Sequence, residues 1–133
     1  MARAKYKNRK VTFEGETYAS RKELKRFQEL ELMQAAGRIT GLRKQVKFVL
    51  IPAQYEPGWV DYSKSTQGRK RKGECIEHEA AYIADFVYLK DGEMVVEDAK
   101  GFRTKDYILK RKMMLYFHGI RIKEVRKCFQ RGN

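Results

Sequence analysis

Cysteine is scarce in this chain of 133 residues, and no long apolar run occurs. The two cysteines, Cys75 and Cys128, are too few for a disulfide framework, and we expect both thiols to be reduced. No segment approaches the about eighteen apolar residues of a membrane span, and the first residues contain no apolar signal core. The sequence therefore predicts a soluble, cytoplasmic protein without a membrane partner.

Acidic residues are also few relative to basic ones. The chain has 30 Lys and Arg residues but only 17 Asp and Glu residues, which gives a net charge of +13. This excess favours a polyanionic partner, and nucleic acid is the first candidate. With 42% hydrophobic residues the chain is nevertheless globular, and its length fits one domain with a real core.

The most informative stretch is Tyr82–Gly101, in which two apolar segments flank Asp91-Gly92. This dipeptide favours a two-residue type I′ turn, because both turn positions require a positive φ. We therefore predict an antiparallel hairpin with strands over 83–89 and 94–99. The turn also sets the register, since it pairs Lys90 with Glu93 and every earlier residue with its counterpart beyond the turn.

This register places Asp85 opposite Asp98 on one face, with Lys100 on the same face and Glu97 on the other. Opposed like charges repel, so one carboxylate has a raised pKa or a cation binds between them. Mg²⁺ suits the second option because it takes one or two carboxylates together with water and substrate phosphates. A frayed, solvated hairpin end is the bland alternative. Apolar residues on both faces argue against it, as in central strands covered on both sides: Ile83, Val87, Leu89, Met94 and Val96 on the acidic face, and Ala84, Phe86, Tyr88, Val95 and Ala99 on the other.

Before this hairpin, Ser20 and Glu23 form a capping box that predicts a helix to Ala36, with Gly37 at its C′ position. Glu23 can be the cap partner, but it also falls within the apolar stripe of the helix, so a site role remains open. A strand follows over 43–51, with Val46, Phe48 and Leu50 on one face and Gln45, Lys47, Val49 and Ile51 on the other.

After the hairpin, Thr104 is expected to cap a helix to about Phe117, with Gly119 beyond its end. A final strand over 120–125 should run parallel to 94–99, because a strand–helix–strand crossover is right-handed. The expected buried stripe of the helix consists of Leu109, Met113, Tyr116 and Phe117. The second half of the chain thus completes the element order αβββαβ.

The segment 53–73 is too long for an ordinary connection and contains the cluster Arg69, Lys70, Arg71 and Lys72. It is either a functional loop or an extended hairpin, and its charges either bind nucleic acid or are simply solvated. Trp59 could stack on bases, pack the segment or form a subunit contact. A small hairpin is possible over 11–18. We divide the single domain into a basic arm (1–10), a first half (11–52), this segment (53–73), a second half (74–125) and a tail (126–133).

The chain resembles the PD-(D/E)XK nuclease superfamily over about residues 20–125. The resemblance rests on the αβββαβ order, on Asp85 in the second strand, on Asp98-x-Lys100 in the third and on Glu23 in the first helix. The segments Tyr-Ile-Ala-Asp-Phe and Val-Glu-Asp-Ala-Lys-Gly look like those of small phage-encoded endonucleases and Holliday junction resolvases. Ile83-Ala84 stands where the superfamily often has a proline before the aspartate.

The resemblance implies an α/β, restriction-endonuclease-like fold with a central mixed sheet flanked by helices. It also implies a DNA endonuclease dependent on Mg²⁺, or on Mn²⁺ in its place, acting in a bacterial host cytoplasm. Glu23, Asp85, Asp98 and the Ala99 carbonyl would hold the metal, and Lys100 would be the catalytic lysine. We expect Lys105, Lys112 and the 69–72 cluster to bind DNA, and a homodimer to cut branched DNA.

Two alternatives remain at this stage. The chain could be a non-catalytic basic DNA-binding module, or a sequence-specific or nicking nuclease on the same core, and an RNA substrate is possible. Cys75 and His78 with His118 and Cys128 could in principle bind zinc, but their spacing matches no structural zinc site.

Overall fold

The computed structural model describes most of the chain, namely residues 11–13, 16–18, 21–99 and 103–125. The predicted basic arm, the tail, the Ser20 cap, Lys100 and Cys128 lie outside the described residues. The chain divides into two compact units, one of residues 1–46 with 83–133 and the other of residues 47–82.

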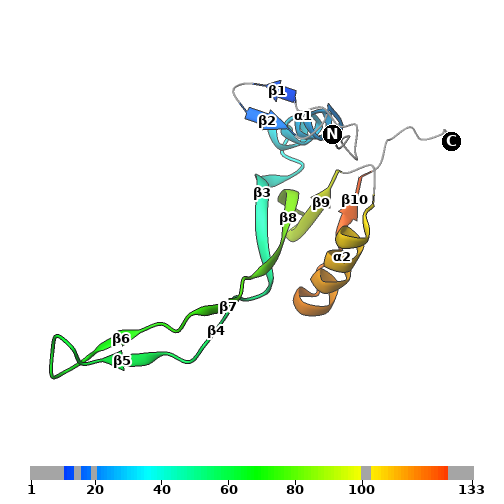
Figure 1. The fold of residues 1–133 in the computed structure, drawn as a ribbon. Helices are drawn as coiled ribbons and strands as arrows, with labels where there is room; N and C mark the ends of the chain where they lie inside the picture. The colour runs from blue at the N-terminus through cyan, green and yellow to red at the C-terminus, as the bar shows by residue number, and fades with distance from the viewer. Residues whose placement is uncertain (1–10, 14–15, 19–20, 100–102, 126–133) are drawn as a thin grey trace. The chain divides into compact units, whose positions relative to one another are not determined.

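The main elements of the first unit follow the predicted order αβββαβ (Figure 1). Four of the strands form a mixed sheet in the order β10-β9-β8-β3, in which β9 is antiparallel to β8 and parallel to β10. The predicted mixed α/β class is therefore confirmed. The small hairpin of β1 and β2 is also confirmed, and it lies beside α1. The bounds are β1 Val11–Phe13, β2 Glu16–Tyr18, α1 Arg21–Ala35, β3 Thr40–Ile51, β8 Ala80–Lys90, β9 Glu93–Asp98, α2 Lys105–His118 and β10 Lys123–Glu124.

The β8–β9 hairpin has the predicted turn and register. Asp91 and Gly92 both have a positive φ, of 52° and 79°, as a type I′ turn requires. Lys90 pairs with Glu93, and the ladder continues in the same register to Phe86 opposite Glu97. Local turn chemistry is thus sufficient to set which side chains of these two strands share a face.

Both helices end where the sequence predicts, because glycine accepts a left-handed backbone. At the end of α1, the Arg38 amide donates to the Met33 carbonyl and the Gly37 amide to the Gln34 carbonyl, at 2.9 and 3.0 Å. This is the Schellman pattern. Thr104 caps α2 by accepting from the Tyr107 amide, and Gly119 follows the helix with φ 67°. The last strand, β10, is shorter than predicted.

The core lies between α1 and one face of the sheet, where Leu30 packs with Phe86 and Tyr88. Val87 and Val96 on the acidic face are also buried. Three other apolar residues of that face, Ile83, Leu89 and Met94, are about half exposed. The prediction that both faces of these strands are covered was therefore wrong at these three positions.

The predicted buried stripe of α2 was also wrong. Tyr107 and Met114 are the buried residues, whereas Leu109, Tyr116 and Phe117 are exposed, Tyr116 at 82%. Tyr107 and Met114 are seven positions apart and therefore share a face, while Leu109 lies about 200° around the helix from Tyr107. Apolar residues occur on several sides of this helix, so the sequence pattern could not select the face that packs.

The second unit contains the segment that was either a loop or an extended hairpin, and it is a hairpin. β4 (Gln54–Tyr55) pairs with β7 (Cys75–Glu77), and further along β5 (Trp59–Asp61) pairs with β6 (Arg69–Arg71), both antiparallel (Figure 1). The unit extends over residues 47–82, beyond the predicted bounds 53–73. We call residues 57–73, which hold β5, β6 and their connection, the ribbon.

Candidate active site

Two of the predicted acidic residues accept hydrogen bonds from the same glutamine side chain. Glu23 lies in the first turn of α1, and Asp85 lies in β8. The Gln45 amide nitrogen donates to Glu23 Oε2 at 2.8 Å and to Asp85 Oδ1 at 3.4 Å. Three elements that are distant in sequence, α1, β3 and β8, therefore bring two carboxylates to one amide group.

Asp98 belongs to the same end of the hairpin. The paired ladder ends at Phe86 and Glu97, the neighbours of Asp85 on β8 and of Asp98 on β9. Asp85 Oδ2 accepts from the Ala99 amide, next to Asp98, at 2.8 Å. Glu23, Asp85 and Asp98 are only 5%, 7% and 1% exposed. Acids buried to this extent need cationic or hydrogen-bonding partners, so this strand end has the burial expected of a functional site.

Gln45 was not singled out in the sequence, where it is one of several polar residues on the outer face of a strand. Its backbone has φ 51°, a left-handed conformation that is uncommon for residues other than glycine. Such strain persists only where the surrounding structure imposes it, and it often occurs at functional sites. No local sequence signal marks this position, since glutamine has no preference for positive φ.

Carboxylate oxygens are ligands that suit Mg²⁺, which often binds through only one or two carboxylates. Glu23 and Asp85 fit this chemistry because both accept from the same amide nitrogen. Among the described residues, no three His, Cys, Asp or Glu side chains form a group able to hold a metal ion. The ligand roles of Asp98 and the Ala99 carbonyl stay predictions, as does the role of Lys100.

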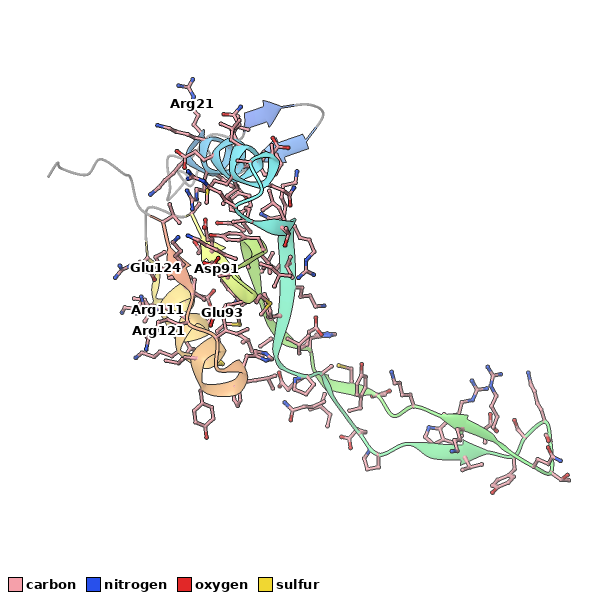
Figure 2. The ribbon with its side chains drawn as sticks, turned by 180° about the vertical axis from the view of Figure 1, so that it is seen from behind. Arg21, Asp91, Glu93, Arg111, Arg121 and Glu124 are labelled. Carbon is pink, nitrogen blue, oxygen red and sulfur yellow. The ribbon has the colours of Figure 1, made fainter. Side chains whose placement is uncertain are left out.

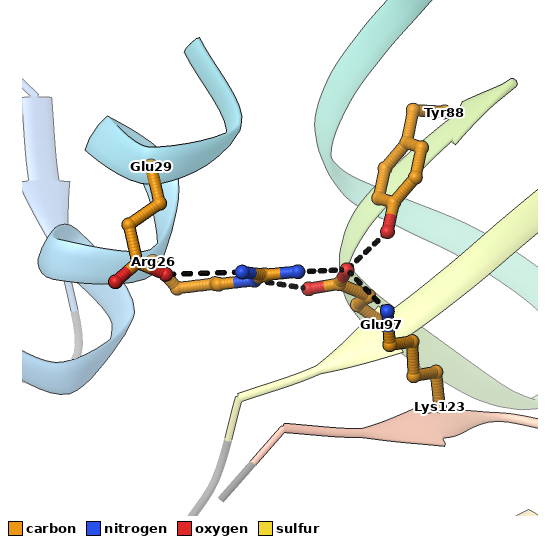
Figure 3. Close-up of polar contacts among 5 residues, drawn as sticks. All are labelled: Arg26, Glu29, Tyr88, Glu97 and Lys123. Atoms are coloured by element: carbon orange, nitrogen blue, oxygen red, sulfur yellow. Dashed lines mark hydrogen bonds and ion pairs between the residues drawn. The ribbon is translucent and has the colours of Figure 1, made fainter. Parts of the chain in front are cut away.

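Glu97, on the other face of the hairpin, is the centre of a buried polar network. Its side chain is fully buried and accepts two hydrogen bonds from the Arg26 guanidinium, both at 2.8 Å, and one from the Tyr88 hydroxyl (Figure 3). The hydrogen bond with Glu97 raises the pKa of Arg26, and burial raises the pKa of Tyr88. This network joins α1 to β9.

Glu124 organises a second polar cluster, next to Asp98 in the β9–β10 register. It accepts from the Tyr107 hydroxyl and from Arg111, both at 2.8 Å, and it pairs with Arg103 at 2.7 Å. Figure 2 shows the labelled Arg111 and Glu124 side chains on α2 and β10. Burial disfavours the charge of Glu124, but the hydrogen bonds from Arg111 and Tyr107 outweigh it and lower its pKa. Burial raises the pKa of Tyr107, helped by Glu124 and the nearby charge of Asp98, so this hydroxyl stays protonated.

The predicted DNA-binding residues lie in both units. Lys105 and Lys112 are exposed on α2, and Arg69, Lys70 and Lys72 are exposed in the ribbon. Cys75 is a free, exposed thiol 3.7 Å from His78 Nδ1, and no zinc group forms among the residues that the structure describes. No described helix is long and apolar enough to cross a membrane.

Comparison with known protein families identifies the family of this chain. A family described as "Protein of unknown function (DUF1064)" matches residues 3–131, almost the whole chain. The chain belongs to the DUF1064 family. No curated protein and no solved structure matches it. The site of this DUF1064 protein must therefore be interpreted from its own geometry.

Proposed function

We propose that this DUF1064 protein is a metal-dependent DNA endonuclease with a PD-(D/E)XK-type core. The observation that carries the proposal is the meeting of Glu23 and Asp85 at the Gln45 amide, beside the strand end that holds Asp98. The αβββαβ order and the mixed sheet support it, as does the net charge of +13. Buried acids within a strongly basic chain suit a division of labour in which the acids hold a cation and the bases hold DNA.

Glu23 and Asp85, whose oxygens accept from the same amide, would hold Mg²⁺ or Mn²⁺. The resemblance to PD-(D/E)XK nucleases adds Asp98 and the Ala99 carbonyl as further ligands. A metal held there would supply Lewis acidity toward a phosphoryl oxygen and toward a water molecule, which is the chemistry that phosphodiester hydrolysis requires. Lys100 would orient that water or stabilise the negative charge that develops on the phosphate. Gln45 would position the Glu23 and Asp85 carboxylates.

Arg103 and Arg111 are suited to contact the DNA backbone close to these acids. Both are partly exposed, and both pair with Glu124. Glu124 lies beside Asp98 in the β9–β10 register. Arginine binds phosphate oxygens through its planar fork, and an anchored guanidinium loses less entropy on binding. Contacts of this kind position the backbone without reading sequence, so DNA shape would decide the substrate.

Cleavage of DNA by the purified chain in Mg²⁺ and in excess EDTA tests the proposal. We expect Asp98→Asn and Lys100→Ala each to reduce cleavage by at least about 100-fold. Both variants should still bind DNA in EDTA, and Asp98→Asn at least as tightly as the parent, because a negative charge near phosphate is removed. Matched controls lie at the other end of the hairpin, where Glu93→Gln and Lys90→Ala change exposed residues and should cleave normally.

Undiminished cleavage by Asp98→Asn, or equal cleavage in EDTA, would refute the assignment. If the parent binds DNA but cleaves neither DNA nor RNA in Mg²⁺ or Mn²⁺, the chain is instead a basic binding module.

Within this class, we further propose that the substrate is branched DNA, above all the four-way junction, and that the enzyme is a homodimer. A junction has two-fold symmetry, and its resolution requires paired nicks in two strands. A C₂ dimer with one site in each subunit supplies them.

A further inference from the structure

The ribbon concentrates the positive charge of its unit. Residues 57–73 carry one acid, Asp61, and five basic residues: Lys64, Arg69, Lys70, Arg71 and Lys72. The negative charge of Asp61 is balanced within the ribbon, because its Oδ2 pairs with Arg71 at 3.3 Å. Its Oδ1 accepts a hydrogen bond from the Ser63 amide. By contrast, the rest of the unit, residues 47–56 and 74–82, has an excess of acidic residues, namely Glu56, Glu74, Glu77 and Glu79.

Both faces of the ribbon carry a cation and an exposed aromatic ring. Trp59 opposes Arg71, and Asp61 opposes Arg69, so these four residues share one face. Val60 and Lys70 lie on the other face. Trp59 is 56% exposed on the first face.

Tyr62 completes the second face. A Cβ atom at Gly68 would lie 2.5 Å from Val60 Cγ1 and 2.7 Å from the Tyr62 ring, so the ring packs across this glycine next to Val60. Gly68 also has φ 79°, which L side chains rarely adopt. Tyr62 is 64% exposed, so the second face also presents an aromatic surface.

Cations on both faces indicate how the ribbon meets a polyanion. A hairpin lying flat on a phosphate backbone uses one face, whereas a hairpin inserted into a groove has a phosphate wall on each side. The major groove of B-DNA, about 12 Å wide, admits a two-stranded ribbon, and the minor groove, about 6 Å wide, is much narrower. A ribbon whose two faces meet the walls spans the groove by its thickness with side chains, which is about 10 Å, the spacing of stacked sheets. This thickness fits the major groove and not the minor groove.

We propose that the ribbon inserts into the major groove of duplex DNA, with Arg69 and Lys70 contacting opposite walls of the groove. The proposal rests on the proposed function only in taking DNA as the partner, and it does not require cleavage. The ribbon is shaped for this role by its own contacts, since its tip is held by hydrogen bonds from the Gln67 and Gly68 amides to Ser65.

The test is dimethyl sulfate protection of a linear duplex of mixed sequence in EDTA, with the full chain. This reagent methylates guanine N7 in the major groove and adenine N3 in the minor groove. We expect the parent to protect guanine N7 and to leave adenine N3 reactive. A variant in which Asn-Gly replaces residues 57–73 should lose this protection. The Glu56 amide donates to the Glu74 carbonyl at 2.8 Å, so the shortened hairpin can close without disturbing β4 and β7.

Two adjacent single variants separate the faces. Arg69→Ala and Lys70→Ala should each weaken binding and reduce the magnitude of the negative slope of log K against log salt by about one, as loss of one phosphate contact predicts. Lys90→Ala, the same charge change in the other unit, is the control for net charge, and thermal melting checks folding.

An effect of only one of the two substitutions would mean that the ribbon lies flat. Adenine N3 protection, or unchanged affinity of both variants and of the shortened chain, would also overturn the proposal. Cleavage of the same duplex and of a four-way junction in Mg²⁺ is measured in parallel. Protection of the duplex without cleavage of either DNA would reject the nuclease and keep the ribbon proposal, and cleavage without protection would do the reverse.

Discussion

Gln45 occupies an unusual position, because a residue with a strained backbone donates to two buried carboxylates. The left-handed conformation of a residue other than glycine costs about 1–3 kcal/mol. The amide nitrogen donates to both Glu23 and Asp85, an arrangement that would orient these carboxylates if they are metal ligands, as proposed. Strain at this residue is therefore consistent with a positioning role.

Two substitutions at Gln45 distinguish the effect of the backbone strain from the effect of the side-chain amide. Gln45→Gly relieves the strain but removes the amide, and Gln45→Ala removes the amide and keeps most of the strain. We expect both variants to lose about 10–100-fold in cleavage and in Mg²⁺ affinity. Gln45→Gly should be at least as stable as Gln45→Ala. Mg²⁺ affinity can be measured from the rise in melting temperature with added metal, which does not depend on turnover.

Gln28→Ala, an exposed glutamine of α1, is the matched control for these variants. Cleavage by Gln45→Gly at the parent rate, with unchanged Mg²⁺ affinity, would show that the amide has no positioning role.

At the scale of elements, the ion pair of Arg26 with Glu97 attaches α1 to β9. Two hydrogen bonds join the guanidinium to a fully buried carboxylate, and Arg26 also pairs with Glu29 at 3.0 Å. A buried pair of this kind need not add much stability compared with apolar residues, but breaking it leaves an uncompensated charge. The position of Glu23 depends on this attachment, since it lies on the same helix.

We predict that Arg26→Met lowers the free energy of unfolding by about 3–5 kcal/mol. The buried Glu97 loses both guanidinium hydrogen bonds and keeps the more distant Lys123, at 4.0 Å, as a cation. The double variant Arg26→Met with Glu97→Met should recover much of this loss, since no unpaired charge remains. Urea denaturation provides the measurement, and Arg21→Met, at an exposed position of α1 (Figure 2), is the control. A single variant as stable as the parent would contradict a structural role for this pair.

At the scale of the whole molecule, the proposed nuclease is expected to have a preferred DNA substrate and a defined assembly. The proposed homodimer should cut a synthetic four-way junction faster than its separate linear arms at equal salt. Its affinity should fall steeply as salt rises, because many Lys and Arg residues displace counterions. Cleavage assays on both substrates, with a solution mass measurement, test these expectations. A strict monomer that cuts linear duplex as fast as the junction would leave the nuclease proposal standing and eliminate the resolvase.

The sequence by itself determined the features that depend on neighbouring residues. Asp91-Gly92 specified the turn and thus the register, and with it the separation of Glu97 from Asp85 and Asp98. Glycines after both helices and Thr104 before α2 specified their ends. Such signals are legible because a turn or a cap is decided by backbone sterics and hydrogen bonds within a few residues.

The tertiary structure alone decided what depends on residues far apart in the chain. It selected Tyr107 and Met114 as the buried side of α2, formed a hairpin from the long basic segment and paired Arg26 with Glu97. It also forced Gln45 into a left-handed backbone between Glu23 and Asp85. The paired residues of the hairpin are eight to twelve positions apart, and the partners of Arg26 and Gln45 are much further away in sequence. Such contacts outweigh local preferences that are worth less than about 1 kcal/mol per residue.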